Sequence, residues 1–292
     1  MRRLRNSYWP LDLFAPMLSS PVSRPFTARN FMAKIIAMTN QKGGVGKTTS
    51  AVNLGASFAA MKRRILLVDL DPQGNATMGC GVDKRGVSHS AYDLLMNEAK
   101  LDEVVIHVEH SHFDLVPSNA DLTGAEVALL DELGRELRLK NALDPVRDNY
   151  DYIIIDCPPA LSMLTVNALT AADSVLIPMQ CEYYALEGLS ALLETVDKIR
   201  KILNPKLEVE GLLRTMFDAR NNLSNQVSQQ LTRHFGAKVY STVVPRNVRL
   251  AEAPSHGLPA LLYDKNSSGA LAYLALAGEV LRRDRARPEI LQ

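Results

Sequence analysis

The sequence predicts an α/β fold, a doubly wound and mostly parallel β-sheet with helices on both faces. Three observations support this prediction. Short apolar runs alternate with longer amphipathic segments along most of the 292 residues. A glycine-rich stretch follows the first apolar run and precedes a helical segment. Two later apolar runs end in aspartate, which would place carboxylates at one edge of a parallel sheet.

The first strand is expected at residues 34–39 and the first helix at 48–61, where apolar residues follow the two corresponding periods. The segment between them reads Lys42-Gly43-Gly44-Val45-Gly46-Lys47-Thr48-Thr49. It fits the phosphate-binding pattern G-x-x-x-x-G-K-[ST] when a lysine is accepted at the first position. The glycines allow backbone N–H groups to turn toward a phosphate. Lys47 would then lie between the β- and γ-phosphates, Thr48 would ligate Mg²⁺, and the helix dipole would favour the anion.

The second strand is expected at residues 64–69 and runs into Asp71-Pro72-Gln73-Gly74-Asn75. Asp69 and Asp71 are two residues apart, so in an extended segment they face the same way, beyond the strand's carboxyl end. One of them could help to hold Mg²⁺ through water while the other orients the attacking water. Asp-Pro and Gly-Asn also form turns without any catalytic role, so these residues alone leave both readings open.

A further buried strand is expected at residues 152–156, and it ends in Asp156. This arrangement is typical of the Walker B strand, whose carboxylate reaches Mg²⁺, here through water. Pro158 and Pro159 stiffen the following loop, a natural position for a switch that senses the γ-phosphate.

The same alternation continues to the end of the chain and predicts a sheet covered on both faces. The remaining strands are expected at 113–116, 174–178, 208–216 and 238–244, and the remaining helices at 121–131, 135–148, 163–171, 185–203, 224–235 and 268–283. Without an internal repeat or a long linker, a single domain over residues 32–285 is expected, followed by a short polar tail at 286–292.

The composition is that of an ordinary globular protein, with 47% hydrophobic and 22% charged residues and a net charge of +1. The sequence contains no apolar run of membrane-spanning length. Three scattered cysteines indicate reduced thiols and a cytosolic protein. Residues 1–31 carry five arginines, one aspartate and four prolines, so we expect a disordered or non-native extension with Met32 as the natural start. A targeting peptide is the alternative for this segment.

Five phrases carry a family resemblance. They are Asn40 to Thr49, Val68-Asp69-Leu70-Asp71-Pro72-Gln73-Gly74-Asn75-Ala76-Thr77, Ile155-Asp156-Cys157-Pro158-Pro159, Gln180 to Gly188 and Pro245 to Gly257. On these phrases, residues 32 to about 283 resemble the ParA/Soj chromosome-partitioning ATPases, which belong to the deviant Walker A group of P-loop NTPases. The first three phrases are shared across that group, and the last two are more specific to Soj-like members. The chain resembles the small form, which lacks an N-terminal helix-turn-helix domain.

The resemblance implies a role for each matching residue. Lys42 would contact the phosphates bound by the other subunit, Lys47 those of its own subunit, and Asp71 would be needed for hydrolysis. Asp156 would be the Walker B carboxylate and Thr48 a Mg²⁺ ligand; with Asp71 assigned to hydrolysis, the two-residue spacing described above leaves Asp69 for the metal. Met216 and the segment Pro245 to Asn247 would line the adenine pocket, and Asn247 would offer its amide to the purine edge. Arg220 and Arg249 match positions that bind DNA.

The implied function is an ATP- and Mg²⁺-dependent homodimer on the nucleoid in the bacterial cytoplasm. It would bind double-stranded DNA without sequence preference and hydrolyse ATP slowly, stimulated by a ParB/Spo0J-like centromere-binding partner. Whether such a protein segregates chromosomes or regulates replication initiation is left open by the sequence.

Two alternative functions are compatible with a P-loop of this kind. A MinD-like cell-division ATPase would share the ATP site but end in an amphipathic membrane-binding helix, whereas residues 282–289 are strongly polar and contain a proline. A P-loop enzyme acting on a small molecule, such as an amide ligase, remains the alternative of a different class.

Overall fold

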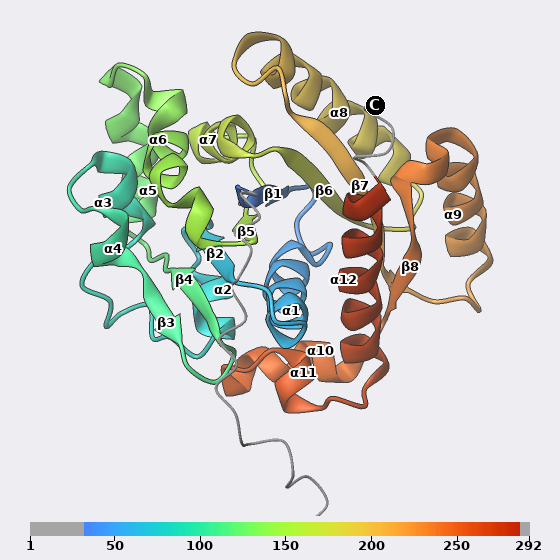
Figure 1. Cartoon of the computed structure of the whole chain (residues 1–292). Helices are drawn as coiled ribbons and strands as arrows, with labels where there is room; N and C mark the ends of the chain where they lie inside the picture. Colours follow the sequence, from blue (N-terminus) through green and yellow to red (C-terminus); the bar gives the residue numbers. More distant parts are fainter. Residues whose placement is uncertain (1–31, 287–292) are drawn as a thin grey trace, which may run out of the picture. The chain divides into compact units, whose positions relative to one another are not determined.

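The computed structural model describes residues 32–286, which form one eight-stranded sheet with the order β3-β4-β2-β5-β1-β6-β7-β8 (Figure 1). All neighbouring strands are parallel except β3 and β4. The strands are β1 (Lys34–Met38), β2 (Ile65–Asp69), β3 (Ile106–Val108), β4 (Phe113–Val116), β5 (Tyr152–Asp156), β6 (Ser174–Gln180), β7 (Glu208–Phe217) and β8 (Val239–Pro245). The predicted doubly wound α/β fold is therefore confirmed.

Helices cover both faces of this sheet (Figure 1). They are α1 (Lys47–Ala60), α2 (Asn75–Gly79), α3 (Ala91–Met96), α4 (Leu101–Val104), α5 (Leu122–Ala128), α6 (Arg138–Leu143), α7 (Met163–Ala171), α8 (Ala185–Ile202), α9 (Asn222–Phe235), α10 (Val248–Glu252), α11 (Ala260–Tyr263) and α12 (Ser268–Ala286). Residues 1–31 and 287–292, for which we expected an extension and a polar tail, lie outside the described range.

Successive strand residues point to opposite faces and enter two separate cores. In β1, Ile35 and Ala37 pack in the core that includes residues of α3 to α9, whereas Ile36 and Met38 pack in the core of α1, α2, α11 and α12. Because both faces of the central strands are buried, their sequences are continuously apolar, which is the signal that made them predictable.

The register of the central strands places the predicted functional segments at one edge of the sheet. Met38 at the end of β1 pairs with Asp156 at the end of β5, and Asp69 at the end of β2 pairs with Asp156 from the other side. From β1 the chain passes through α1 on one face of the sheet, and from β5 through α7 on the opposite face. The crevice where connections diverge in this way is the usual ligand site of doubly wound sheets.

The structure differs from the sequence prediction mainly in short elements. Strand β3, which was not expected, is a three-residue antiparallel edge strand, too short to show a period. The helix expected at 135–148 is divided into α6 and flanking 3-10 turns at Arg135–Leu137 and Asp144–Asn149. Pro145 lies in the first turn of the last of these, where its missing N–H prevents continuation of α6. Helices α2, α3, α4, α10 and α11 were also not expected.

Two further expectations can be compared with the structure. Cys80, Cys157 and Cys181 are buried free thiols, in agreement with the sequence prediction. None of the helices between residues 32 and 286 has the length and apolar character needed to span a bilayer.

Candidate functional site

The glycine-rich loop leaves β1 and leads directly into α1. Gly44 and Gly46 have φ angles of 71° and 87°, in the left-handed region that favours glycine. Gly46 is also the N-cap of α1 and has no side chain to cap it, so the first N–H groups of the helix face the loop. The loop is anchored from two neighbouring strands, because Thr215 donates to the carbonyl of Val45 at 2.8 Å and Asn40 donates to the carbonyl of Pro178 at 2.8 Å. The backbone is therefore held in an anion-binding conformation.

The helix that follows the loop is fixed from its far side by the C-terminal part of the chain. The hydroxyls of Ser50 on α1 and Tyr273 on α12 are hydrogen-bonded at 3.0 Å inside the protein. Asn53 accepts a hydrogen bond from the N–H of Ala260, at the start of α11, at 2.8 Å. These contacts set the direction in which α1 presents its N-terminus to the loop.

Lys47 is buried at the beginning of α1, and its ammonium donates to the carbonyl of Lys42 at 3.2 Å. Burial lowers the pKa of Lys47, and the opposite charge of Asp156 counteracts this only in part. A phosphate placed against the loop would supply the negative charge that this buried ammonium lacks.

Asp156 is the side chain best suited to hold a cation. It is completely buried, and within residues 32–286 neither of its carboxylate oxygens has a hydrogen bond of normal geometry. Burial, followed by the charge of Asp69, raises its pKa well above the usual value, while the nearby Thr48 hydroxyl lowers it. A buried carboxylate with two open oxygens beside a hydroxyl fits a hydrated divalent cation. Among residues 32–286, no three His, Cys, Asp or Glu side chains gather at a metal-binding distance, at this site or at any other.

Asp69 has a different environment from the one expected for a metal ligand. Its Oδ1 accepts the N–H of Asp71 at 3.1 Å, and its Oδ2 accepts both the N–H and the hydroxyl of Thr77 at 2.8 Å. Burial raises the pKa of Asp69 to about 6, although the Thr77 bonds oppose the shift. Because these donors occupy the carboxylate, the geometry favours Asp156 over Asp69 as the metal ligand and gives Asp69 the task of shaping the turn.

The same turn positions Asp71 through residues that sequence reasoning missed. Ser118, which follows β4, donates its hydroxyl to the carbonyl of Asp71 at 2.7 Å and its N–H to the hydroxyl of Thr77 at 2.9 Å. The Asp71 carboxylate accepts the N–H of Gln73 at 2.9 Å. Ser118 has no recognisable signal in the sequence, since it reaches the turn only because β4 pairs with β2.

Lys42 lies on the exposed side of the loop, where its ammonium forms an ion pair with Glu182. Glu182 belongs to the segment between β6 and α8, and both side chains are about half exposed, at 50% and 49%. The Lys42 side chain thus contacts the Glu182 carboxylate of the same chain.

The residues expected around adenine are only partly brought together. Pro245 lines a surface hollow of about 740 Å³ together with Phe217 and Val248. Met216 has a φ of 48°, and its sulfur contacts the Gln180 amide at 2.6 Å. Asn247, whose amide was expected at the purine edge, also forms hydrogen bonds within the fold.

In Asn247, the side-chain oxygen caps α10 by accepting the N–H of Leu250 at 3.3 Å. Its amide nitrogen donates to the hydroxyl of Ser268 at 2.9 Å. These two bonds fix the side chain at the start of α10 and leave one N–H and one lone pair of the amide for a further partner.

The two expected DNA contacts are surface arginines that already have acidic partners. Arg220 is 91% exposed, and its guanidinium bonds both oxygens of Asp218, at 2.9 and 2.8 Å. Arg249 pairs with Glu252 at 2.7 Å and with Asp264 at 3.3 Å. Phosphates would have to compete with these carboxylates for the two guanidinium groups.

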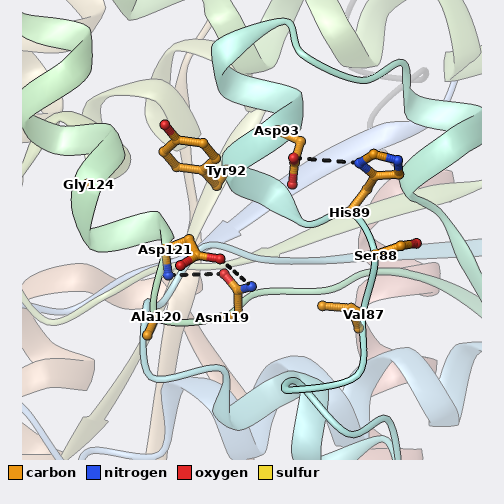
Figure 2. A pocket seen from close by; sticks show the side chains of 9 residues that line it. All are labelled: Val87, Ser88, His89, Tyr92, Asp93, Asn119, Ala120, Asp121 and Gly124. Atoms are coloured by element: carbon orange, nitrogen blue, oxygen red, sulfur yellow. Dashed lines mark hydrogen bonds and ion pairs between the residues drawn. The ribbon is translucent and has the colours of Figure 1, made fainter.

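A second hollow, of about 480 Å³, lies beside the N-terminal ends of α3 and α5 (Figure 2). The Nδ1 atom of His89 lies 3.6 Å from the Asp93 carboxylate along one side, and Asn119 and Asp121 are hydrogen-bonded to one another on the other side. Carboxylates on both sides would repel a polyphosphate, so we place the nucleotide at the glycine loop instead.

This chain is similar to several known proteins. The family described as AAA domain matches residues 33–209. The sporulation initiation inhibitor protein Soj of Bacillus subtilis is 57% identical over 249 residues, which cover 85% of this chain and 98% of Soj. The chromosome partitioning protein ParA of Myxococcus xanthus is 53% identical over 253 residues, covering 87% of this chain and 89% of ParA.

A similar solved structure is cobyrinic acid a,c-diamide synthase from Mycobacterium smegmatis with a bound ATP analogue and magnesium. Its TM-score is 0.77 at 36% identity, and the match covers 87% of this chain and 96% of the synthase.

Proposed function

Because this chain belongs to the ParA/Soj family of chromosome-partitioning ATPases, we propose that it acts as a dimeric switch driven by ATP. ATP and Mg²⁺ bind at the glycine loop and two copies pair. The dimer holds double-stranded DNA without sequence preference, and slow hydrolysis, stimulated by a ParB/Spo0J-like partner, releases it. The observation that supports the nucleotide site most strongly is the buried Asp156 carboxylate, whose two oxygens have no hydrogen bond of normal geometry to any described residue. Asp156 pairs with Met38, the last residue of the strand that leads into the loop before Lys47.

The chain's own residues suggest how the nucleotide is held. Backbone N–H groups of Gly43 to Thr49 and the Lys47 ammonium bind the phosphates. Thr48 and Asp156 would hold Mg²⁺, which when bound neutralises negative charge that develops on the phosphates. Asp71, whose carbonyl at the start of the turn accepts the Ser118 hydroxyl, would orient the attacking water.

Pairing is assigned to Lys42, whose side chain is exposed at the edge of the same loop. In the proposed dimer it reaches the phosphates of the other subunit, so the oligomeric state follows the nucleotide state. This role comes from the family resemblance and is supported by the accessibility of the ammonium.

DNA binding is assigned to Arg220 and Arg249, which contact phosphates rather than bases. Such binding falls steeply with salt, and pairing doubles the number of contacts. The dimer would therefore remain on the nucleoid in the cytoplasm while ATP is bound.

The test uses an Asp71→Ala variant, which should retain ATP. With Mg·ATP it should sediment as a dimer and retain nonspecific DNA at low salt, and with ADP it should do neither. The variant that also carries Lys42→Ala should stay monomeric. A Mg·ATP-saturated Asp71→Ala protein that remains monomeric, or binds DNA no better than nucleotide-free wild type, would refute the switch.

A second candidate function is a small-molecule enzyme, because the similar solved structure at 36% identity is an amide-forming synthase. The higher identity to Soj and ParA favours the partitioning role. ATP turnover that rises with a carboxylic-acid metabolite instead of with a ParB-like protein would favour the synthase. ATP-dependent retention on anionic vesicles would instead favour a MinD-like role.

A further inference from the structure

We propose that Glu182 is a positioning residue that holds Lys42 on its own subunit and so restrains pairing until ATP is bound. This inference rests on the proposed cross-subunit role of Lys42. Its basis is the ion pair between the Lys42 ammonium and the Glu182 carboxylate within a single chain.

The backbones of both residues are fixed where they meet. The N–H of Lys42 donates to the Asn40 side chain at 3.0 Å, and its carbonyl accepts the Lys47 ammonium at 3.2 Å. On the other side, the N–H of Glu182 donates to the carbonyl of Gln180 at 3.0 Å, and the carbonyl of Glu182 accepts the N–H of Ala185 at 3.0 Å. Only the side chains are free to separate, so the pair can open while the loop and α8 stay in place.

In the proposed dimer, the Lys42 ammonium leaves Glu182 to reach a phosphate in the other subunit. Forming the dimer therefore breaks one such pair in each copy. The surface beside the pair is suited to being covered, since the neighbouring Tyr183 and Tyr184 are 74% and 70% exposed and contact each other edge to face. A second copy of this chain is the occupant that would cover this surface and remove Lys42 from Glu182.

The size of the effect follows from the exposure of the pair. A half-exposed ion pair shifts an equilibrium by at most about fivefold, because water and salt screen it. Two pairs break per dimer, so removing the carboxylate should strengthen pairing by up to about 25-fold. The restraint is thus small enough for ATP to overcome.

The experiment measures dimerisation by sedimentation as a function of Mg·ATP in the Asp71→Ala background. Glu182→Gln should pair at a severalfold lower ATP concentration than the parent. Glu194→Gln, which removes a carboxylate from an exposed position on the helix that follows, α8, should behave like the parent. In a Lys42→Ala background Glu182→Gln should have no effect, because the group that it restrains is absent.

A second measurement follows the pair itself. A carbodiimide should link Lys42 to Glu182 in the nucleotide-free protein, detected by mass spectrometry, and the link should decrease when Mg·ATP is added.

The outcomes separate this inference from the proposed function. If the parent pairs with ATP but Glu182→Gln pairs at the same or a higher concentration, the restraint is refuted and the switch is retained. A link that persists undiminished in the ATP dimer refutes the restraint as well. If the parent itself does not pair, the proposed function fails, and the restraint falls with it.

Discussion

Replacing Thr77 with valine tests the buried network that positions Asp71. The Thr77 hydroxyl donates to Asp69 at 2.8 Å and accepts the N–H of Ser118 at 2.9 Å, and all of these groups are buried. Thr77→Val keeps the shape but removes a hydrogen bond to a carboxylate, worth about 1.5–3 kcal/mol, and leaves a buried N–H unpaired, which costs about 1–3 kcal/mol. The added methyl recovers roughly 0.8 kcal/mol. The expected loss of unfolding free energy is about 3 kcal/mol, or roughly 6–12 °C in Tm.

Circular dichroism during urea and thermal unfolding measures this loss, since the single tryptophan, Trp9, lies outside the described residues. The matched control is Thr170→Val, because the Thr170 side chain is equally buried but donates only to a carbonyl of its own helix, at 2.8 Å. We expect the control to change stability by less than about 1 kcal/mol.

Thr77→Val should also lower the rate of ATP hydrolysis more than the affinity for ATP, because the change moves the turn of Asp71 and leaves the glycine loop intact. A Thr77→Val protein as stable as wild type, or one that loses ATP binding as severely as hydrolysis, would show that this network does not position Asp71.

Three other predictions concern separate parts of the molecule. Gly257→Ala should lower the free energy of unfolding in urea by more than about 2 kcal/mol. The φ of Gly257 is 64°, and the new Cβ would lie 2.6 Å from the Cα of Gly81. An unchanged free energy of unfolding would contradict this packing. Glu279 is buried, which raises its pKa, but hydrogen bonds from Thr242 and Ser241 lower it more, so the net pKa is below 4.5. Its stabilisation is present above pH 4.5 and is lost as the pH falls through the native pKa, so Glu279→Gln should cost stability at pH 7 and progressively less in acid; an equal difference at pH 7 and pH 3 would oppose the assignment. Arg220→Ala should weaken DNA retention by the ATP dimer. It should also reduce the slope of log K for DNA against log salt concentration by about two, because one phosphate contact is lost per subunit. An unchanged slope would show that Arg220 does not contact DNA.

The parts of the fold that the sequence predicted are those whose pattern is local. Strands β1, β2 and β5 are continuous apolar runs because helices bury both of their faces, and α12 is long enough to show its period. Strand β3 has three residues, and α10 has five and begins at the Asn247 cap, so neither shows a period. Elements of this length form where their neighbours hold them.

The candidate site divides in a similar way. The glycine loop, Lys47 and Asp156 could be predicted because the chemistry of phosphate and metal binding fixes their residue types and spacing. The side-chain partners of Lys42 and Asn247 could not, because Glu182 and Ser268 come from other segments that meet them only in the folded protein. Thr77, the partner of Asp69, is close in sequence, but the direction of its side chain is set by the fold. A carboxylate looks the same in sequence whether it faces a cation or is saturated by the Thr77 hydroxyl and N–H.

The hydrogen bond between Ser50 and Tyr273 joins the first helix to the last one across 223 residues. During synthesis, α1 emerges from the ribosome early, but the surface that fixes its direction emerges at the very end. A nascent chain therefore carries a complete glycine loop before α12 is there to fix the direction of α1. Full affinity for nucleotide should be reached only after translation finishes. A protein truncated before Tyr273 would lack the same support, so it should bind nucleotide poorly although its glycine loop is intact.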